Sequence, residues 1–246
     1  MAERYESEYR TVCFNGIEIS YQLIRKEVKN LNLRIRPDGT VLVSANPAVP
    51  VVRIDEFISD KGGYILSTLK KFEEMVQYRP KPKAFVSGET FNILGHGLRL
   101  EVFQGKKNEV TSDGVFLHLS VKEPDDDKAR ERIVKRYLDK RCREVFKEVF
   151  EQCYPVFHKH GVPMPELRIR DMETRWGSCS PKRCVITLNK QLLVAPRHCI
   201  EYVVTHELCH MVHPNHSRWF YEFLTMHMPD WRERKKTLDQ YALFWL

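Results

Sequence analysis

The sequence has no uninterrupted apolar run near the length of about 20 residues that a membrane-spanning helix needs. Its opening stretch, MAERYESEYR, lacks the cationic start and the apolar core of a secretion signal. The seven cysteines are odd in number and scattered, which argues against a disulfide framework. We therefore expect a soluble, cytoplasmic protein with free thiols and no attachment to a membrane.

The sequence also lacks any long block of one charge, any internal repeat and any low-complexity segment. There are 40 Lys and Arg against 33 Asp and Glu, which gives a net charge of +7 dispersed over the chain. This surplus favours mild attraction to anionic partners; nucleic acid is compatible with it but is not indicated. The 246 residues are enough for one large domain or two small ones, and the oligomeric state stays open.

Short strands dominate the first half of the chain, where apolar and alternating segments are separated by turn residues. The predicted strands cover residues 11–14, 17–23, 31–35, 40–43, 91–94, 98–103 and 115–121. Between them, helical spacing over 52–77 predicts a helix that Gly62 and Gly63 interrupt. The acidic turn at 123–127 suits the start of a helix, so we place the boundary of a β-rich N-terminal region at 1–122.

Helical spacing dominates the second half, which we predict to be a separate domain over 123–246. Residues 128–160 predict one long helix or a pair of helices, and two short strands at 167–170 and 185–188 follow. Pro196 is suited to the start of a further helix. The fold class that this order indicates is α+β.

A pair of histidines on that further helix carries the chemistry. Residues 206–210 read His-Glu-Leu-Cys-His, and imidazoles four residues apart on a helix can share one metal ion. Glu207 projects roughly 100° away from His206, beside the ion rather than onto it. A cation that lowers the pKa of its bound water, with a carboxylate to take the proton, is what metal-assisted hydrolysis needs. The pattern predicts a metal-dependent hydrolase with Glu207 as general base.

The third ligand is predicted to be His216. Pro214 ends the helix and lets the chain turn back towards the metal. His213 is the rival, but seven residues of helical rise, about 10 Å, separate it from His206, so we expect it at the rim or outside the ligand shell. The remaining alternatives are Glu222 and Glu233 of the following helices. One zinc ion is the expected cofactor, and other divalent transition metals stay open.

Further motif residues accompany these ligands along the chain. In order they are Arg175-Trp176-Gly177-Ser178-Cys179-Ser180, Asn189, Leu192, Pro196, His206-Glu207-Leu208, His210, Asn215-His216-Ser217 and Phe220. In this order, over Thr174 to Phe220, the sequence resembles the YgjP-like metal-dependent hydrolases, which are related to the SprT-like and WLM metallopeptidases. A weaker resemblance at residues 87–89 and 94–95 extends over the first part.

The resemblance implies a β-rich N-terminal region joined to a small zincin-like catalytic domain with an HExxH active-site helix. It also implies that His206, His210 and His216 bind zinc and that Glu207 is the general base. This agrees with the ligand spacing but is a separate argument.

Three residues are candidates for substrate binding. Arg175 is placed to polarise a substrate oxygen or to hold an anionic group, and Trp176 to line a cleft; packing and surface ion pairing are the alternatives for both. Asn189 is the third candidate, within the motif that carries the resemblance. The strand near 185–189 is expected to align an extended peptide by edge pairing.

Three functions follow from this site. The first is a metallopeptidase that acts on peptides or unfolded protein. The second is a nucleoside triphosphate pyrophosphatase or phosphohydrolase on the same site, motivated by the net charge of +7 and by Arg175, Lys182 and Arg183. The third is a non-catalytic zinc module that binds nucleic acid or protein. Glu207 argues against the third, because a structural zinc site does not need that carboxylate.

Overall fold

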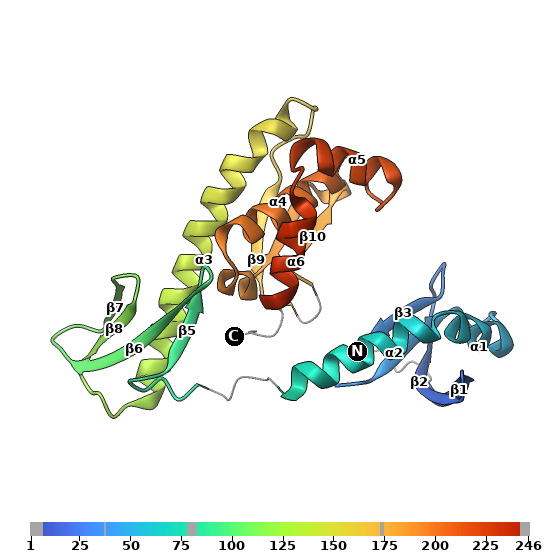
Figure 1. The fold of residues 1–246 in the computed structure, drawn as a ribbon, viewed down its shortest axis with the longest axis horizontal. Helices are drawn as coiled ribbons and strands as arrows, with labels where there is room; N and C mark the ends of the chain where they lie inside the picture. Colours follow the sequence, from blue (N-terminus) through green and yellow to red (C-terminus); the bar gives the residue numbers. More distant parts are fainter. Residues whose placement is uncertain (1–6, 37, 78–82, 173–174, 242–246) are drawn as a thin grey trace. The chain divides into compact units, whose positions relative to one another are not determined.

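The structure of the protein is a computed structural model that describes residues 7–36, 38–77, 83–172 and 175–241. Thr174, the first residue of the family resemblance, lies outside the described residues. The chain divides into two compact units, Met1–Arg79 and Pro80–Leu246. Both mix helices with sheets, as predicted (Figure 1).

The first unit is a four-stranded sheet followed by two helices. The strands are β1 (Ser7–Phe14), β2 (Ile17–Arg25), β3 (Asn32–Ile35) and β4 (Val41–Ala45), in the order β1-β2-β4-β3, with only β2 and β4 parallel. The helices are α1 (Val51–Asp60) and α2 (Gly62–Gln77). The predicted interruption at Gly62 is confirmed. A side chain at Gly62 would collide with the Phe14 ring, so glycine allows the close approach of helix and strand.

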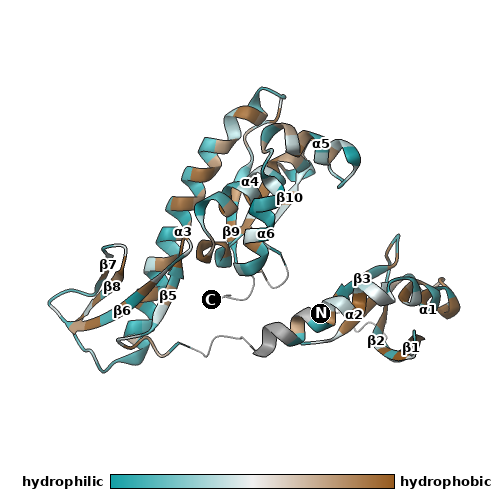
Figure 2. Cartoon of the chain, viewed as in Figure 1, coloured by the Kyte–Doolittle hydropathy of each residue, from teal (hydrophilic) through white to brown (hydrophobic). Residues whose placement is uncertain are grey.

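The second unit begins with another four-stranded sheet and one long helix. The strands are β5 (Thr90–Ile93), β6 (His96–Gln104), β7 (Glu109–Ser112) and β8 (Phe116–Val121), in the order β5-β6-β8-β7. The helix α3 (Asp127–His158) is single, and Asp126 caps it by accepting a 2.9 Å hydrogen bond from the Ala129 N–H. Apolar and polar residues alternate along α3 in Figure 2, as expected for a helix with one buried face.

The division between the units differs from the predicted boundary at 122–123. Leu100 and Leu119 of the second sheet share one hydrophobic core with Phe146 of α3. The turn between β5 and β6 is also bound to the later part of the chain, because the Leu94 and Gly95 N–H groups donate to main-chain carbonyls of residues 193 and 194 at 2.7 and 3.0 Å. The sheet β5–β8 therefore belongs to the unit that contains residues 123–246.

A three-stranded sheet and three helices complete the second unit. The strands are β9 (Glu166–Arg170), β10 (Gly177–Ser180) and β11 (Val185–Asn189), in the order β10-β11-β9. A 3₁₀ turn, η1 (Pro181–Arg183), joins β10 to β11, and a second, η2 (Lys190–Val194), leads to α4 (Arg197–Val212), α5 (Arg218–His227) and α6 (Trp231–Tyr241). Most residues of α4 are buried, so this helix runs through the core of the unit.

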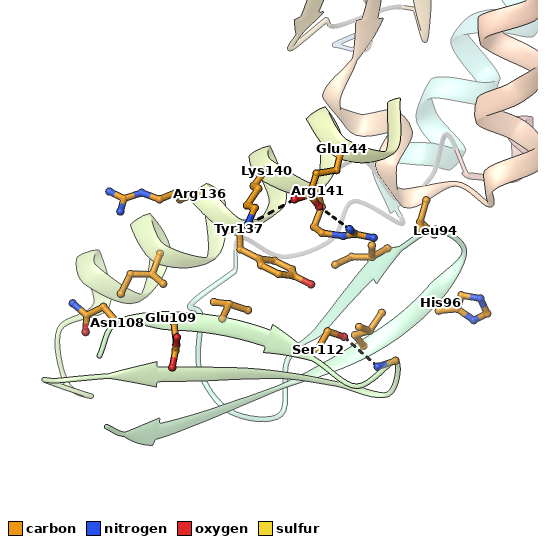
Figure 3. A pocket seen from close by; sticks show the side chains of 15 residues that line it. Leu94, His96, Asn108, Glu109, Ser112, Arg136, Tyr137, Lys140, Arg141 and Glu144 are labelled. Carbon is orange, nitrogen blue, oxygen red and sulfur yellow. Dashed lines mark hydrogen bonds and ion pairs between the residues drawn. The ribbon is translucent and has the colours of Figure 1, made fainter. Parts of the chain in front are cut away.

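A cavity of about 690 Å³ lies between α3 and the sheet β5–β8. Figure 3 shows Tyr137 directed towards the strands, with Lys140 and Arg141 beside it on α3. Both cations are engaged with Glu144, at 3.7 and 2.7 Å. None of the candidate site residues lines this cavity, so it is not the predicted site.

Two expectations drawn from composition can be compared with the structure. All seven cysteines are free thiols, as predicted. In the described part of the chain no helix is both long enough and apolar enough to cross a membrane.

Candidate metal centre and catalytic site

Three histidines are brought together by the end of α4 and the turn that follows it. As predicted, the helix ends before Pro214: His213 has an extended backbone, with φ −122° and ψ 93°. Ser217 then starts α5 by accepting a hydrogen bond from the Phe220 N–H at 3.4 Å. The turn between the two helices returns His216 to the face of α4 that carries His206 and His210.

The three imidazoles have the spacing of metal ligands. One ring nitrogen from each of His206, His210 and His216 lies within 4.8 Å of the others, and the Nε2 atoms of His206 and His216 are 3.0 Å apart. A tetrahedral zinc ion with Zn–N bonds of about 2.0–2.1 Å would separate its ligand nitrogens by about 3.3 Å. The residues present therefore fit one such ion with small adjustments.

The three rival ligands lie outside the group of imidazoles. The His213 ring lies against Phe223, with 5.3 Å between the ring centroids. Glu222 accepts a 2.6 Å hydrogen bond from Arg218, and Glu233 is exposed at the start of α6. None of the three is in the group that could hold an ion, which among the described residues consists of His206, His210 and His216.

The surroundings of the imidazoles orient them. His210 Nδ1 lies 3.2 Å from the main-chain oxygen of His213, and because a carbonyl only accepts, Nδ1–H is the donor and Nε2 keeps its lone pair for a cation. The His213 main chain therefore orients the His210 ring. The fully buried Phe220 ring packs beneath all three imidazoles, with centroids 5.0, 4.6 and 4.8 Å from those of His206, His210 and His216.

Burial favours the neutral form of the His206 imidazole. Desolvation, followed by the neighbouring His210 and His216, lowers the pKa of His206 to about 3. Desolvation also lowers the pKa of His210. Because a metal binds the neutral form of imidazole, both side chains are in the ligating form at neutral pH.

Glu207 follows His206 on α4 and is buried, with 6% of its surface exposed. Burial raises the pKa of its carboxyl to about 8, and the positive charge of Arg175 acts in the opposite direction. A cation held by the imidazoles would act as Arg175 does and favour the ionised carboxylate. Its carboxyl is not among the groups that could hold the ion, and its role as general base stays a prediction.

Strand β10 lies directly against Glu207, and Gly177 makes this contact possible. A Cβ atom at Gly177 would lie 2.8 Å from Oε1 and 2.9 Å from Cγ of Glu207, and 3.0 Å from Cγ1 of Val203. Real Cβ atoms essentially never show contacts under 3.0 Å. Sequence reasoning included Gly177 in the motif but assigned it no role. The available signal was a glycine at the start of a strand, which often marks a close approach.

Asn189 occupies a different position from the one predicted for a substrate-binding residue. Its side chain is fully buried, and its Nδ2 donates to the carbonyls of Met172 and Arg175 at 2.8 and 2.9 Å. Its Oδ1 accepts from the Gln191 N–H at 3.2 Å. Asn189 therefore fastens the segment that leads into β10, because its amide is used by main-chain groups and has no access to a substrate.

Replacing Asn189 with Ala is expected to lower the free energy of unfolding by about 1–3 kcal/mol, because the partly buried main-chain carbonyls that Asn189 Nδ2 binds would lose their donor. Urea unfolding would measure this loss. Asn108→Ala is the matched control, since Asn108 is exposed in the same unit and accepts one main-chain hydrogen bond, from Lys122 at 2.9 Å. If the two variants are equally stable and Asn189→Ala binds substrate more weakly, Asn189 is a substrate-binding residue, as the sequence predicts.

The other two candidates lie at the site. Arg175 is exposed and acts electrostatically on Glu207. Trp176 is half-buried against the core, and its carbonyl accepts the Asn189 N–H at 2.8 Å. Contact of Arg175 and Trp176 with a substrate stays a prediction.

The strand predicted to pair with a peptide is not an edge strand. β11 is the central strand of its sheet, antiparallel to β10 and parallel to β9, so its main-chain groups are already paired. That expectation was wrong. In the described part of this sheet β10 pairs only with β11, and it is also the strand that touches Glu207 through Gly177.

The family assignment agrees with this geometry. The model of the family described as "YgjP-like, metallopeptidase domain" matches residues 29–241. The chain belongs to the YgjP-like family. The match begins inside the first compact unit and includes the whole candidate metal centre. The YgjP-like chain is therefore a member of a metallopeptidase family, which makes it a metal-dependent hydrolase by class and implies a metal cofactor.

Two solved structures are weakly similar to the YgjP-like chain. They are the metallopeptidase zymogens jannalysin of Methanocaldococcus jannaschii and abylysin of Pyrococcus abyssi. Jannalysin is 20% identical, with coverage of 39% of this chain and 96% of its own and a TM-score of 0.35. Abylysin is 22% identical, with coverage of 39% and 90% and a TM-score of 0.34. Likeness this low carries no argument about the site. No curated protein matches the sequence.

Proposed function

We propose that the YgjP-like chain is a zinc-dependent peptidase that cleaves extended or unfolded polypeptide. The observation that carries this proposal is the grouping of ring nitrogens from His206, His210 and His216 within 4.8 Å, together with the buried carboxyl of Glu207 on the helix that holds the first two. A zinc ion bound there would supply Lewis-acid chemistry, lowering the pKa of a water molecule and polarising a peptide carbonyl.

Glu207 is the general base in this proposal. Its carboxylate accepts a proton from the attacking water and then donates that proton to the nitrogen of the leaving amine. The contact with Gly177 limits where the carboxyl can lie, since β10 main chain packs against it. Arg175 stabilises the ionised form, which is the form that accepts a proton.

Strand β10 is the element that would align the substrate. Gly177 and Cys179 face α4: Gly177 touches Glu207, and the Cys179 sulfur lies 3.3 Å from that of Met211. The edge of β10 opposite β11 offers main-chain donors and acceptors that an extended peptide can pair with. Pairing of this kind is independent of side chains, and it requires a substrate segment that is not folded.

Among the described residues, the positions of Lys182 and Arg183 give the nucleotide alternative no support. Lys182 and Arg183 lie in η1, beyond the Ser180 end of β10, whereas Gly177 at the other end touches Glu207. Three residues of strand separate the two ends by about 10 Å. The cationic turn is therefore displaced along the strand from the proposed base.

A substrate screen of the zinc-loaded protein tests the proposal. We expect new amino termini from a disordered protein such as casein, loss of this activity after chelation, and its return when zinc is added. Cobalt and manganese additions would compare other ions at the same site. Release of phosphate from nucleoside triphosphates, without peptide cleavage, would establish the alternative chemistry instead. Zinc binding with no hydrolysis of either substrate would indicate a binding module.

A further inference from the structure

We infer that a groove between α5 and α6 binds a large apolar side chain of the polypeptide substrate, next to the bond that is cleaved. The groove has a volume of about 720 Å³. Tyr221, Thr225 and Met226 of α5 line it, together with Trp231 and Arg232 of α6. The inference rests on the proposed peptidase function and names the class of residue that the enzyme would select.

The wall of the groove is aromatic and aliphatic. The Tyr221 and Trp231 rings are stacked, with centroids 5.5 Å apart and planes inclined by 21°. Trp231 is almost buried, whereas Tyr221 and Met226 are 38% and 61% exposed. The indole N–H of Trp231 donates to the Thr225 hydroxyl at 2.9 Å. The polar group of the largest ring is thus satisfied inside the protein, which leaves an apolar surface for an occupant.

The charges around the groove have partners. Arg218, which also lines it, donates to Glu222 on the same helix at 2.6 Å. The Arg232 guanidinium lies over the Trp231 ring, 4.5 Å from its centroid. Because Arg218 is paired with Glu222 and Arg232 is held against the Trp231 ring, the exposed surface of Tyr221 and Met226 stays available to an uncharged occupant.

Ring contacts connect the wall of the groove with the candidate metal centre. The Tyr221 ring is stacked on His216 with 6.1 Å between centroids. The Trp231 ring also stacks on Tyr202, with 6.4 Å between the ring centroids, and the Tyr202 ring lies 5.8 Å from that of His206. Successive residues of an extended peptide are about 3.3 Å apart. A side chain in the groove therefore belongs to a residue one or two positions from the bond held at the metal.

This position identifies the occupant as part of the substrate. The open groove, with a volume near 720 Å³, leaves room for one large side chain with its flanking main chain. Leu, Phe and Met are among the residues most often buried in folded proteins and become accessible when a chain unfolds. The groove thus favours unfolded or misfolded segments over the surfaces of folded proteins.

Matched peptides that differ at one position beside the cleaved bond test the inference. We expect kcat/KM for Phe to exceed that for Ala by about 10- to 100-fold, and Asp to be no better than Ala. In Tyr221→Ala and Met226→Ala the Phe-to-Ala ratio should fall about three- to tenfold. Trp219→Ala is the matched control, because Trp219 is on the same helix, is 67% exposed and does not line the groove. Its ratio should equal that of the wild type.

A binding measurement separates this inference from the proposed function. Zinc-loaded Glu207→Gln, titrated calorimetrically with the Phe and Ala peptides, should bind the Phe peptide at least tenfold more tightly, and Tyr221→Ala in the same background should remove the difference. If Glu207→Gln shows this preference for the Phe peptide but the wild type cleaves neither peptide, the proposed peptidase activity is refuted and the groove as a binding site is supported. If the wild type cleaves the Phe and Ala peptides at equal rates, the groove is refuted as the selecting site and the peptidase activity is supported. If Trp219→Ala lowers the Phe-to-Ala ratio as much as Tyr221→Ala does, the surface that selects the side chain lies outside the groove.

Discussion

Replacing Glu207 with Gln is expected to lower kcat/KM for peptide cleavage by about three orders of magnitude while the zinc content stays at one ion per chain. Gln has nearly the shape of Glu and fits the same space beside Gly177, but its amide cannot accept the proton from water. General base catalysis contributes about 10²–10⁴-fold, which sets the size of the loss. Steady-state kinetics with metal analysis of the same samples would measure both quantities.

Glu201→Gln is the matched control for this variant. Glu201 lies on the same helix but pairs with Arg234 at 2.6 Å and Arg197 at 3.6 Å, away from the imidazoles. The kcat/KM of Glu201→Gln should stay within a few-fold of that of the wild type. Loss of zinc from Glu207→Gln would show that the carboxylate is a ligand, and retained activity would show that the base is another residue.

Local sequence patterns identified the parts of the site that depend on neighbours in the chain. Helical spacing placed His206, Glu207 and His210 on one helix, and that is where α4 holds them. The return of His216 followed from Pro214, because proline ends a helix by sterics and by its missing donor. These inferences needed the geometry of one turn and no knowledge of what packs against it.

Packing between distant segments could not be predicted in the same way. The alternation that indicates a strand does not say which strands are its neighbours, so β11 was taken for an edge although it is paired on both sides. The compact units divide at a different point from the predicted boundary at 122–123, for a related reason. An acidic turn marks the start of α3, but whether β5–β8 packs on that helix depends on a core shared by residues such as Leu119 and Phe146.

Burial of polar and small residues depends on the same long-range packing. Asn189 was predicted to face the substrate, yet its amide is enclosed because the segment before β10 folds over it. Gly177 was assigned no role from the sequence, because its contact with Glu207 arises only when β10 packs against α4. The sequence placed both residues in the motif, but their functions depend on contacts that span more than ten positions.

Replacing Gly177 with Ala is expected to lower kcat about 100-fold with little change in KM or zinc content, because Glu207 must move away from the new Cβ and small displacements of a reacting group cost about that much. The stability cost should be about 1–3 kcal/mol, as for overpacked cores. Ser178→Ala is the control, since successive side chains of a strand point to opposite faces and Ser178 points away from Glu207.

A double-mutant cycle separates positioning of Glu207 from a general defect in β10. In the Glu207→Ala background the Cγ and Oε1 atoms that the new Cβ would meet are gone, and the approach to Val203 at 3.0 Å remains. Gly177→Ala should therefore cost clearly less free energy of unfolding in that background than in the wild type. This readout needs no catalysis and no metal. An equal cost in both backgrounds, or a Gly177→Ala enzyme with the kcat of the wild type, would mean that the glycine does not position the base.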